Sequence, residues 1–255
     1  MRRALLLLLF VPVPAFAQIL SPDYTLLGVA VRTRPAYDGS ASQATDLIPV
    51  VRYYGSPWFA RTTQGILEGG VRAEVVRGLN LGAQISYDEG RKASESEFLS
   101  SHGFPDISPG ASVGVHAEWD FNLGKMPLTL LARYRQNADT DRGAKTDLRF
   151  NAGVFESGSA VAVVYVQATW ANAKSNQFFY GISAEQSAAT GLPAYSPGSG
   201  LLSTTLGLLW SADLTRSWVL IGGLSWVHLQ GDAANSPITE RTSNYYANLG
   251  IAYRF

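Results

Sequence analysis

The chain ends with the residues NYYANLGIAYRF, positions 244–255. Every second residue of this stretch, ending with Ile251, Tyr253 and Phe255, is apolar or aromatic, whereas Asn248 and Arg254 fall in the intervening set. Alternation with a period of two is typical of a β-strand that has one apolar and one polar face. A chain end frays unless it is tied into a sheet. The sequence therefore predicts a terminal strand with one face in an apolar medium.

The first residues predict export. Arg2 and Arg3 precede an apolar run from Ala4 to Val11, and the residues Ala-Phe-Ala at 15–17 come directly before Gln18. This order is typical of a secretory signal, so we expect a cleaved leader over 1–17 and a mature chain over 18–255. The alternative is a membrane anchor, which needs roughly 20 apolar residues, more than this run supplies.

The composition narrows the classes of protein. Loss of Arg2 and Arg3 with the leader leaves 18 Lys+Arg against 20 Asp+Glu, which gives no electrostatic case for binding nucleic acid. The chain has no cysteine, which excludes disulfides and thiolate metal sites. Its mean hydropathy is close to zero, too polar for a bundle of membrane helices.

The alternation of the last strand recurs along the chain. It is found in LNLGAQISYDE (79–89), SVGVHAEWDF (112–121), PLTLLARYRQ (127–136) and TDLRFNAGVF (146–155). Segments of about ten residues with one apolar face are the signature of a transmembrane β-barrel. Because an unpaired N–H or C=O costs several kcal/mol in hydrocarbon, the last strand must pair with the first. We therefore predict an all-β, antiparallel transmembrane barrel in the outer membrane of a Gram-negative bacterium, surrounded by outer-membrane lipid.

Turn signals give the strand count. Short turns at 54–58, 76–80, 122–127, 156–159 and 212–217 are expected on the periplasmic side, with longer loops outside the cell. Treating 177–186 as a strand gives an odd count, so the whole of 171–200 is assigned to one extracellular loop. The least certain strand boundary is at Gln64-Gly65. If one long strand replaced the two short strands there, the segment 177–186 would be a further membrane-spanning strand. We expect about twelve strands, at 25–34, 46–54, 57–63, 66–76, 80–88, 111–121, 128–136, 147–155, 159–170, 201–212, 217–229 and 243–255.

The polar face of these strands is expected to line the lumen. Its charged members are Arg32, Arg52, Arg61, Glu68, Arg72, Glu74, His116, Glu118, Asp120, Arg133, Arg135, Arg149 and Arg254. Arginines and carboxylates on neighbouring strands can line a selective channel or can form a salt-bridged interior that keeps the barrel rigid. Barrel interiors are polar by default, which favours the second interpretation.

Catalysis has few candidate residues. Only His102, His116 and His228 offer a base near neutral pH, and His116 alone lies close to carboxylates, Glu118 and Asp120, at two-residue spacing. No serine or threonine has the spacing of a nucleophile motif, and no H-E-x-x-H metal motif exists. We therefore predict that the protein is not an enzyme and has no catalytic, cofactor-binding or metal-binding residues.

The loops resemble a known family. The motifs RPAYDG (34–39), DLIPVVRYYG (46–55), YDEGR (87–91), FYGIS (179–183), GLPAY (191–195) and GDAANSP (231–237), in this order and followed by Tyr-Arg-Phe, are similar to those of the MltA-interacting protein (MipA)/OmpV family of outer-membrane proteins. The motif residues are Pro35, Tyr37, Gly39, Tyr180, Gly181, Gly191, Tyr195, Gly231, Asp232, Ser236 and Pro237. Their Pro, Gly, Asp and Asn residues suit tight turns, and the tyrosines suit either packing over the barrel mouth or recognition of a glycan or host surface.

The resemblance implies a β-barrel fold, and it also suggests which proteins the barrel interacts with. Ile251, Tyr253 and Phe255 resemble the end of outer-membrane proteins that the barrel assembly machinery recognises. One member of the family is described as a scaffold that joins a lytic murein transglycosylase to a bifunctional penicillin-binding protein. The function expected from the resemblance is therefore that of a non-enzymatic scaffold for murein-remodelling enzymes. A pore for small solutes and a surface adhesin are the alternatives.

Overall fold

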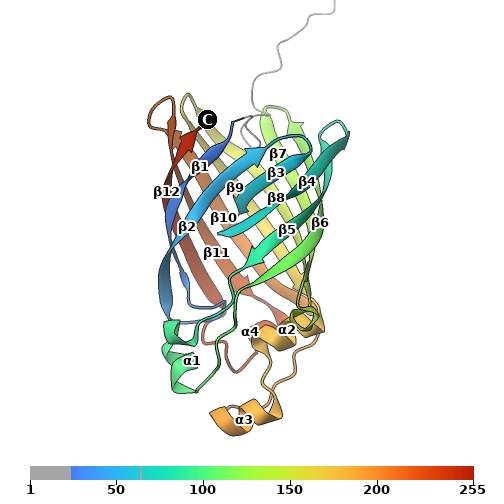
Figure 1. Cartoon of the computed structure of the whole chain (residues 1–255), viewed down its shortest axis with the longest axis vertical. Coiled ribbons are helices and arrows are strands. Elements are labelled where there is room, and N and C mark those ends of the chain that lie inside the picture. Colours follow the sequence, from blue (N-terminus) through green and yellow to red (C-terminus); the bar gives the residue numbers. More distant parts are fainter. Residues whose placement is uncertain (1–23, 64) are drawn as a thin grey trace, which may run out of the picture.

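The computed structural model describes residues 24–63 and 65–255, so the leader expected over 1–17 lies outside the described residues. It is a closed antiparallel barrel in which each strand pairs with its neighbours in sequence and β1 pairs with β12 (Figure 1). This confirms the expected fold and strand count. The strands are β1 Leu26–Pro35, β2 Gln43–Tyr54, β3 Trp58–Thr63, β4 Ile66–Val76, β5 Leu79–Asp88, β6 Gly110–Leu123, β7 Met126–Asn137, β8 Ala144–Ser157, β9 Ala160–Ala171, β10 Gly200–Asp213, β11 Trp218–Leu229 and β12 Ser243–Arg254.

The two ends of the barrel differ. Tight turns join the strands at the periplasmic end, where the C-terminus lies, and the extracellular end carries the longer loops and all the helices (Figure 1). The helices are η2 Ala93–Glu95, α1 Glu97–Ser101, η3 Thr140–Arg142, α2 Ala173–Tyr180, α3 Ala184–Thr190 and α4 Gly231–Ala234. Because only α2 and α3 lie between β9, which ends at Ala171, and β10, which begins at Gly200, the assignment of this stretch to one loop is confirmed. In the described part of the chain, no helix has the length and apolar character needed to cross a membrane.

The outer face carries the apolar half of the alternation. On the β11–β12 pair, Trp226 lies opposite Tyr245 at the extracellular end, and Trp218 lies opposite Tyr253 at the periplasmic end. Between them Leu224 and Leu249 are both more than half exposed. An exposed apolar band between two aromatic rows matches the lipid-facing surface of an outer-membrane barrel.

The shortest strand of the barrel is β3, which has only six residues. Among the described residues β2 pairs with β3 only from Arg52 to Tyr54, so the rest of β2, residues 43–51, pairs on one side alone, with β1. The hydroxyl of Thr62 extends this contact, since it donates to the Pro49 carbonyl at 2.8 Å and accepts from the Val51 amide at 3.3 Å. Proline has no N–H to leave unpaired, so it suits an edge strand.

Small residues close the barrel where its first and last strands meet. Gly28 lies opposite Ala252, and a Cβ added at Gly28 would meet the Ile251 carbonyl oxygen at 2.1 Å. Gly250 lies opposite Ala30 with a similarly tight approach, 2.5 Å from the Ala30 Cβ. The sequence thus supplies glycine where two backbones come closest.

Candidate functional site: a charged lumen under a closed cap

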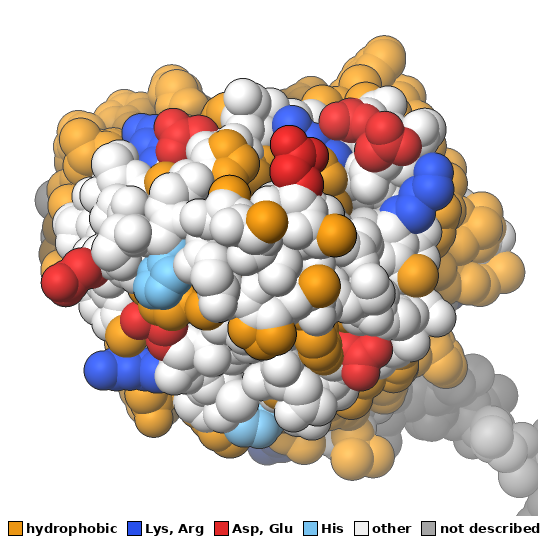
Figure 2. All heavy atoms as spheres, turned by 90° about the horizontal axis from the view of Figure 1, so that it is seen from below, with side chains coloured by type: hydrophobic (Ala, Val, Ile, Leu, Met, Phe, Trp, Pro, Cys, Tyr) orange, Lys and Arg blue, Asp and Glu red, His pale blue; other side chains and the backbone are white. Residues whose placement is uncertain are grey.

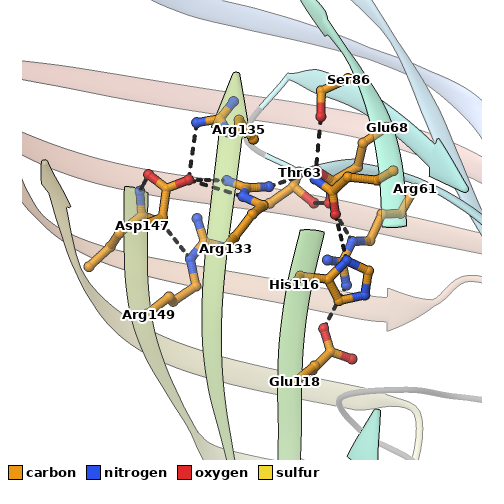
Figure 3. Close-up of polar contacts among 12 residues, drawn as sticks. Arg61, Thr63, Glu68, Ser86, His116, Glu118, Arg133, Arg135, Asp147 and Arg149 are labelled. Atoms are coloured by element: carbon orange, nitrogen blue, oxygen red, sulfur yellow. Dashed lines mark hydrogen bonds and ion pairs between the residues drawn. The ribbon is translucent and has the colours of Figure 1, made fainter. Parts of the chain in front are cut away.

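The centre of the lumen is crossed by ion pairs between strands far apart in sequence (Figure 3). Glu68, which is 1% exposed, accepts from Arg61 Nε at 2.6 Å and from Arg133 Nη1 at 2.6 Å. Arg61 also reaches Glu118 at 2.7 Å, so β3, β4, β6 and β7 are joined through the interior. A buried charge is tolerated when it is paired and hydrogen-bonded in this way.

Asp147 is the second centre of this network. It is 1% exposed and accepts from Arg133 Nη2 at 2.9 Å and from Arg135 Nη2 at 3.0 Å. Its other oxygen accepts from the Thr169 hydroxyl at 2.9 Å and from the Gln167 amide at 3.3 Å. Arg133 therefore bridges Glu68 and Asp147 and links the two centres.

Cations outnumber the carboxylates available to them in this region. Arg61, Arg72, Arg133 and Arg135 share only Glu68, Glu118 and Asp147. Arg149 is 4% exposed, donates from Nε to Gln167 Oε1 at 2.8 Å and lies over the Tyr165 ring at 4.4 Å. Within the described residues, neither Arg149 nor Lys145 has a carboxylate within ion-pair distance.

The opposite wall is apolar. Leu26, Ala30, Ile48 and Val50 of β1 and β2 are buried and pack with Val219 and Ala252 of β11 and β12. Around a ring of twelve strands, β1 lies six places from β7, so this wall faces the arginines. The two walls enclose a cavity of about 470 Å³, lined by Ile48, Val50 and Ile221 as well as by Arg61, Arg133, Arg135 and Arg149.

The other expected lumen residues lie nearer the two ends. At the extracellular end Arg32 pairs with Asp46 and with Glu89, both at 2.7 Å. At the periplasmic end Asp120 accepts from the Thr129 hydroxyl at 2.6 Å, and Arg72 makes a longer contact, 3.4 Å, with Glu118. Arg32, Glu118 and Thr129 also line the cavity, so these contacts lie along its wall toward the two ends.

Three expected lumen residues lie at the periplasmic rim. Arg254 pairs with Asp213, and both Arg254 and Arg52 lie over the Tyr24 ring, at 4.3 and 5.2 Å. Glu74 is exposed and accepts from the Gly78 amide at 2.6 Å. It is not among the residues that line the cavity, and the β4–β5 register shifts directly after it.

The histidines do not form one site. His116 is 5% exposed and donates from Nδ1 to Gln84 Oε1 at 2.6 Å, while the Gln84 amide donates to Glu68 at 2.9 Å and so fixes the direction of both bonds. Glu118 and Asp120, two and four residues further along β6, do not contact His116 but accept hydrogen bonds from Arg61 and from the Thr129 hydroxyl. His102 contacts the Phe98 carbonyl and His228 contacts Ser243, and both histidines lie at the extracellular end of the barrel. Among the described residues no group of three His, Cys, Asp or Glu side chains could hold a metal.

The loops form a cap with an apolar core of its own. Leu99, Phe104, Ile182 and Ile238, from three different loops, are at most 5% exposed and pack together. Figure 2 shows this face as a continuous, mostly uncharged surface without a channel mouth. The extracellular end is therefore closed by packed side chains.

The tyrosines of the family motifs bind the cap together. Tyr37 packs on this core and donates to the Ile238 carbonyl at 2.7 Å, and burial raises its pKa so that the phenol keeps its proton. Tyr195 donates to the Asp232 carbonyl at 2.8 Å. Tyr180 is 5% exposed in a second apolar cluster, with Leu202 and Leu229.

The other motif residues shape the loops. Ser236 donates to the Tyr180 carbonyl at 2.6 Å, and Asp232 accepts from the Gly198 amide at 2.7 Å. Gly39, Gly191 and Gly231 have positive φ angles of 103°, 76° and 50°, which favour glycine. The remaining motif residues are Pro35, the last residue of β1, Gly181, which caps α2, and Pro237, between Ser236 and the cap residue Ile238.

The residues of the C-terminal signature face outward. Ile251 and Tyr253 are 39% and 37% exposed, and Phe255 is 71% exposed. The Phe255 ring meets the Tyr253 ring edge to face at 4.9 Å, and its amide donates to the Thr25 carbonyl at 3.1 Å. The last residue is thus tied to the start of β1.

Sequence reasoning missed three carboxylates of the network. Asp147 lies two residues before Arg149 on the same alternating face, and Asp46 lies two before Ile48, so the alternation could have found both. Glu89 lies beyond the end of β5 and is 57 residues from Arg32. No pattern along the chain indicates that contact.

Comparison with known proteins gives the family. The family model described as MltA-interacting protein MipA matches residues 27–255. The MltA-interacting proteins of Escherichia coli (strain K12) and Shigella flexneri are each 25% identical over 101 residues, a match that covers 40% of this chain and 40% of each relative. The match thus spans well under half the length of those relatives.

The chain is also similar to solved outer-membrane barrels, and its fold is shared by the first of the two that follow. The NanC porin is 11% identical with a TM-score of 0.52, over 90% of this chain and all of that one. An outer membrane channel from Pseudomonas putida F1 is also 11% identical, with a TM-score of 0.48 over 92% and 96% of the two chains. With the closed barrel and the family match over 27–255, the chain belongs to the MltA-interacting protein MipA family of outer-membrane β-barrels.

Proposed function

We propose that this barrel is a non-enzymatic interaction protein of the cell envelope, exported by a cleaved leader and inserted by the barrel assembly machinery. In this proposal it holds a lytic murein transglycosylase, with a penicillin-binding protein as a further partner. The names of its relatives, MltA-interacting protein, support the partner class.

The observation that carries the proposal is the closure of the lumen. Ile182 and Ile238 at 1% exposure seal the cap, and Glu68 and Asp147 at the same exposure are held by arginines across the interior. A barrel closed in this way suits a structural or docking role better than free diffusion of solutes.

Partner capture tests the proposal. The mature barrel, tagged within α3, is inserted in lipid nanodiscs and exposed to purified periplasmic lytic transglycosylases and penicillin-binding proteins of the source organism. Retention of a transglycosylase is expected. The matched control is a barrel of another family with equally short periplasmic turns, and equal retention on both, or on neither, contradicts the proposal.

A channel for small solutes is the second candidate. The cavity of about 470 Å³ lined by arginines favours it, since a lumen used only as a rigid support needs no such space. Conductance of single barrels in planar bilayers separates the two functions, because a docking protein leaves the bilayer silent. Surface adhesion, the third function expected from the sequence, would use the cap of Figure 2, and removal of 183–191 would then abolish binding to a host surface while the barrel still folds.

A further inference from the structure

The charged wall contains donors that the protein itself does not use. Arg61 Nη2, Arg135 Nε and Arg149 Nη2 are buried and have no hydrogen-bond partner within the described residues. The three residues are at most 9% exposed, and all three line the same cavity. Because a buried donor without a partner destabilises the fold, three of them on one cavity point to an acceptor that binds there.

The arrangement of charge on β7 and β8 points the same way. Arg135 lies directly opposite Lys145, and like charges at opposed positions of two strands repel. Asp147 already accepts from Arg133, Arg135, Thr169 and Gln167. Asp38 and Asp88 also line the cavity, but among the described residues neither forms an ion pair with Arg135 or Lys145. Figure 3 shows Arg135 and Arg149 on either side of this carboxylate. A bound negative charge would reduce this repulsion.

The apolar wall opposite the arginines indicates the chemical character of the rest of the ligand. Ile48, Val50 and Ile221 line the same cavity and offer no charge. A cavity of about 470 Å³ lies within the range of small-molecule sites, roughly 300–1,000 Å³. A small inorganic anion would leave this apolar surface uncovered, whereas an anion with an apolar body would cover both walls.

We propose that the lumen binds an organic anion with an apolar body, whose carboxylate or similar oxyanion lies against Arg135, Arg149 and Lys145 while its body packs on the Ile48–Val50 wall. Guanidinium groups suit this contact because their planar donors match a carboxylate in pairs. The site is a property of the lumen and does not depend on which protein the barrel binds.

Octanoate serves as the probe, titrated calorimetrically into the full mature barrel in nanodiscs, with empty nanodiscs as blank. Octanamide carries the same tail without the charge, and acetate carries the charge without the tail. Octanoate is expected to bind more tightly than either. Equal affinity for octanoate and octanamide, or no binding at millimolar concentration, overturns the proposal.

Variants place the ligand. Arg149→Gln is expected to weaken octanoate binding at least about tenfold, while Arg77→Gln, which removes a cation from an exposed periplasmic turn, leaves it unchanged. Lys145→Gln is the second variant, because Lys145 has no ion pair among the described residues and its loss spares the network. Binding unchanged in both lumen variants overturns the proposal.

A change on the opposite wall tests the apolar half. Val50→Thr keeps the side-chain shape and adds a hydroxyl, so it is expected to weaken octanoate binding and leave acetate unaffected. A shift of gel mobility on boiling verifies that each variant is folded. If Val50→Thr changes acetate and octanoate alike, the ligand does not lie across the two walls.

Discussion

At the scale of single residues, the lumen depends on a few buried carboxylates that each serve several cations. Glu68 accepts from Arg61, Arg133 and Gln84, so three strands other than its own are tied to one side chain. The desolvation of such a group is offset only while its partners stay in place. If the carboxylate is lost, the arginines that it neutralised become buried charges without a partner, which destabilises the folded barrel.

Glu68→Ala is therefore expected to destabilise the barrel by about 3 kcal/mol or more, because two buried arginines lose their shared partner. Urea unfolding in lipid vesicles measures the change. Glu185→Ala, on the exposed face of α3, is the matched control and is expected to have little effect. Equal effects of the two substitutions would show that the network adds nothing to stability.

Tyr37 gives the cap a pH dependence. Burial raises the pKa of its phenol, so the folded cap holds the proton to a higher pH than the unfolded chain, whose tyrosines titrate near pH 10. The stability that this proton provides is complete below about pH 10 and is lost as the pH rises further. Protease cleavage of the loops should accelerate above this pH, and Tyr37→Phe should reduce the acceleration. An unchanged pH profile in Tyr37→Phe would place the effect elsewhere.

At the scale of strands and loops, the hairpin of β3 and β4 is the least supported part of the wall. Where backbone pairing between β2 and β3 ends, the Thr62 hydroxyl takes the place of the next pair of ladder bonds. This makes a side chain responsible for the continuity of the sheet.

Thr62→Val keeps the shape of the side chain and removes both hydrogen bonds, with an expected cost of about 1–2 kcal/mol. The Val51 amide should exchange with solvent faster, as measured by hydrogen exchange. Thr146→Val, at an exposed position of β8, is the control. If the Val51 amide exchanges at the same rate in both variants, Thr62 is not what closes the ladder.

The sequence predicts the strands well because lipid imposes a strict alternation on each of them. The parity of the count also identified 171–200 as one loop. The expected strand boundary near Gln64-Gly65 falls between two separate strands, β3 and β4. The partners inside the lumen are harder to predict, because Arg133 and Glu68 are 65 residues apart and meet only through the register of four strands. The helices of the loops escaped prediction as well, since α1 and α4 span only five and four residues and are set by tertiary contacts.

At the scale of the whole molecule, the barrel is closed at its extracellular end and cross-linked at its centre. The cap holds together through an apolar core that includes Leu99 and Ile238, and the lumen through ion pairs. The cap and the centre of the barrel are thus stabilised by two different kinds of interaction.

Ile238→Asp is expected to loosen the cap, because it places a charge in an apolar cluster at 1% exposure. Single barrels in planar bilayers should then conduct more than the parent protein, whose current should be small. Ala188→Asp, on the exposed side of α3, should behave as the parent does. A large current from the parent that Ile238→Asp does not alter would show that the cap is open to ions.

The unpaired side of β2 also limits what can join the sheet from outside. The Pro49 carbonyl points to this side, and the residue has no N–H to donate there. A strand from another molecule that paired with β2 would therefore lack one backbone hydrogen bond in the middle of the pairing. Pairing of a second copy along this margin would lack this hydrogen bond at Pro49, which disfavours a continuous sheet between two barrels.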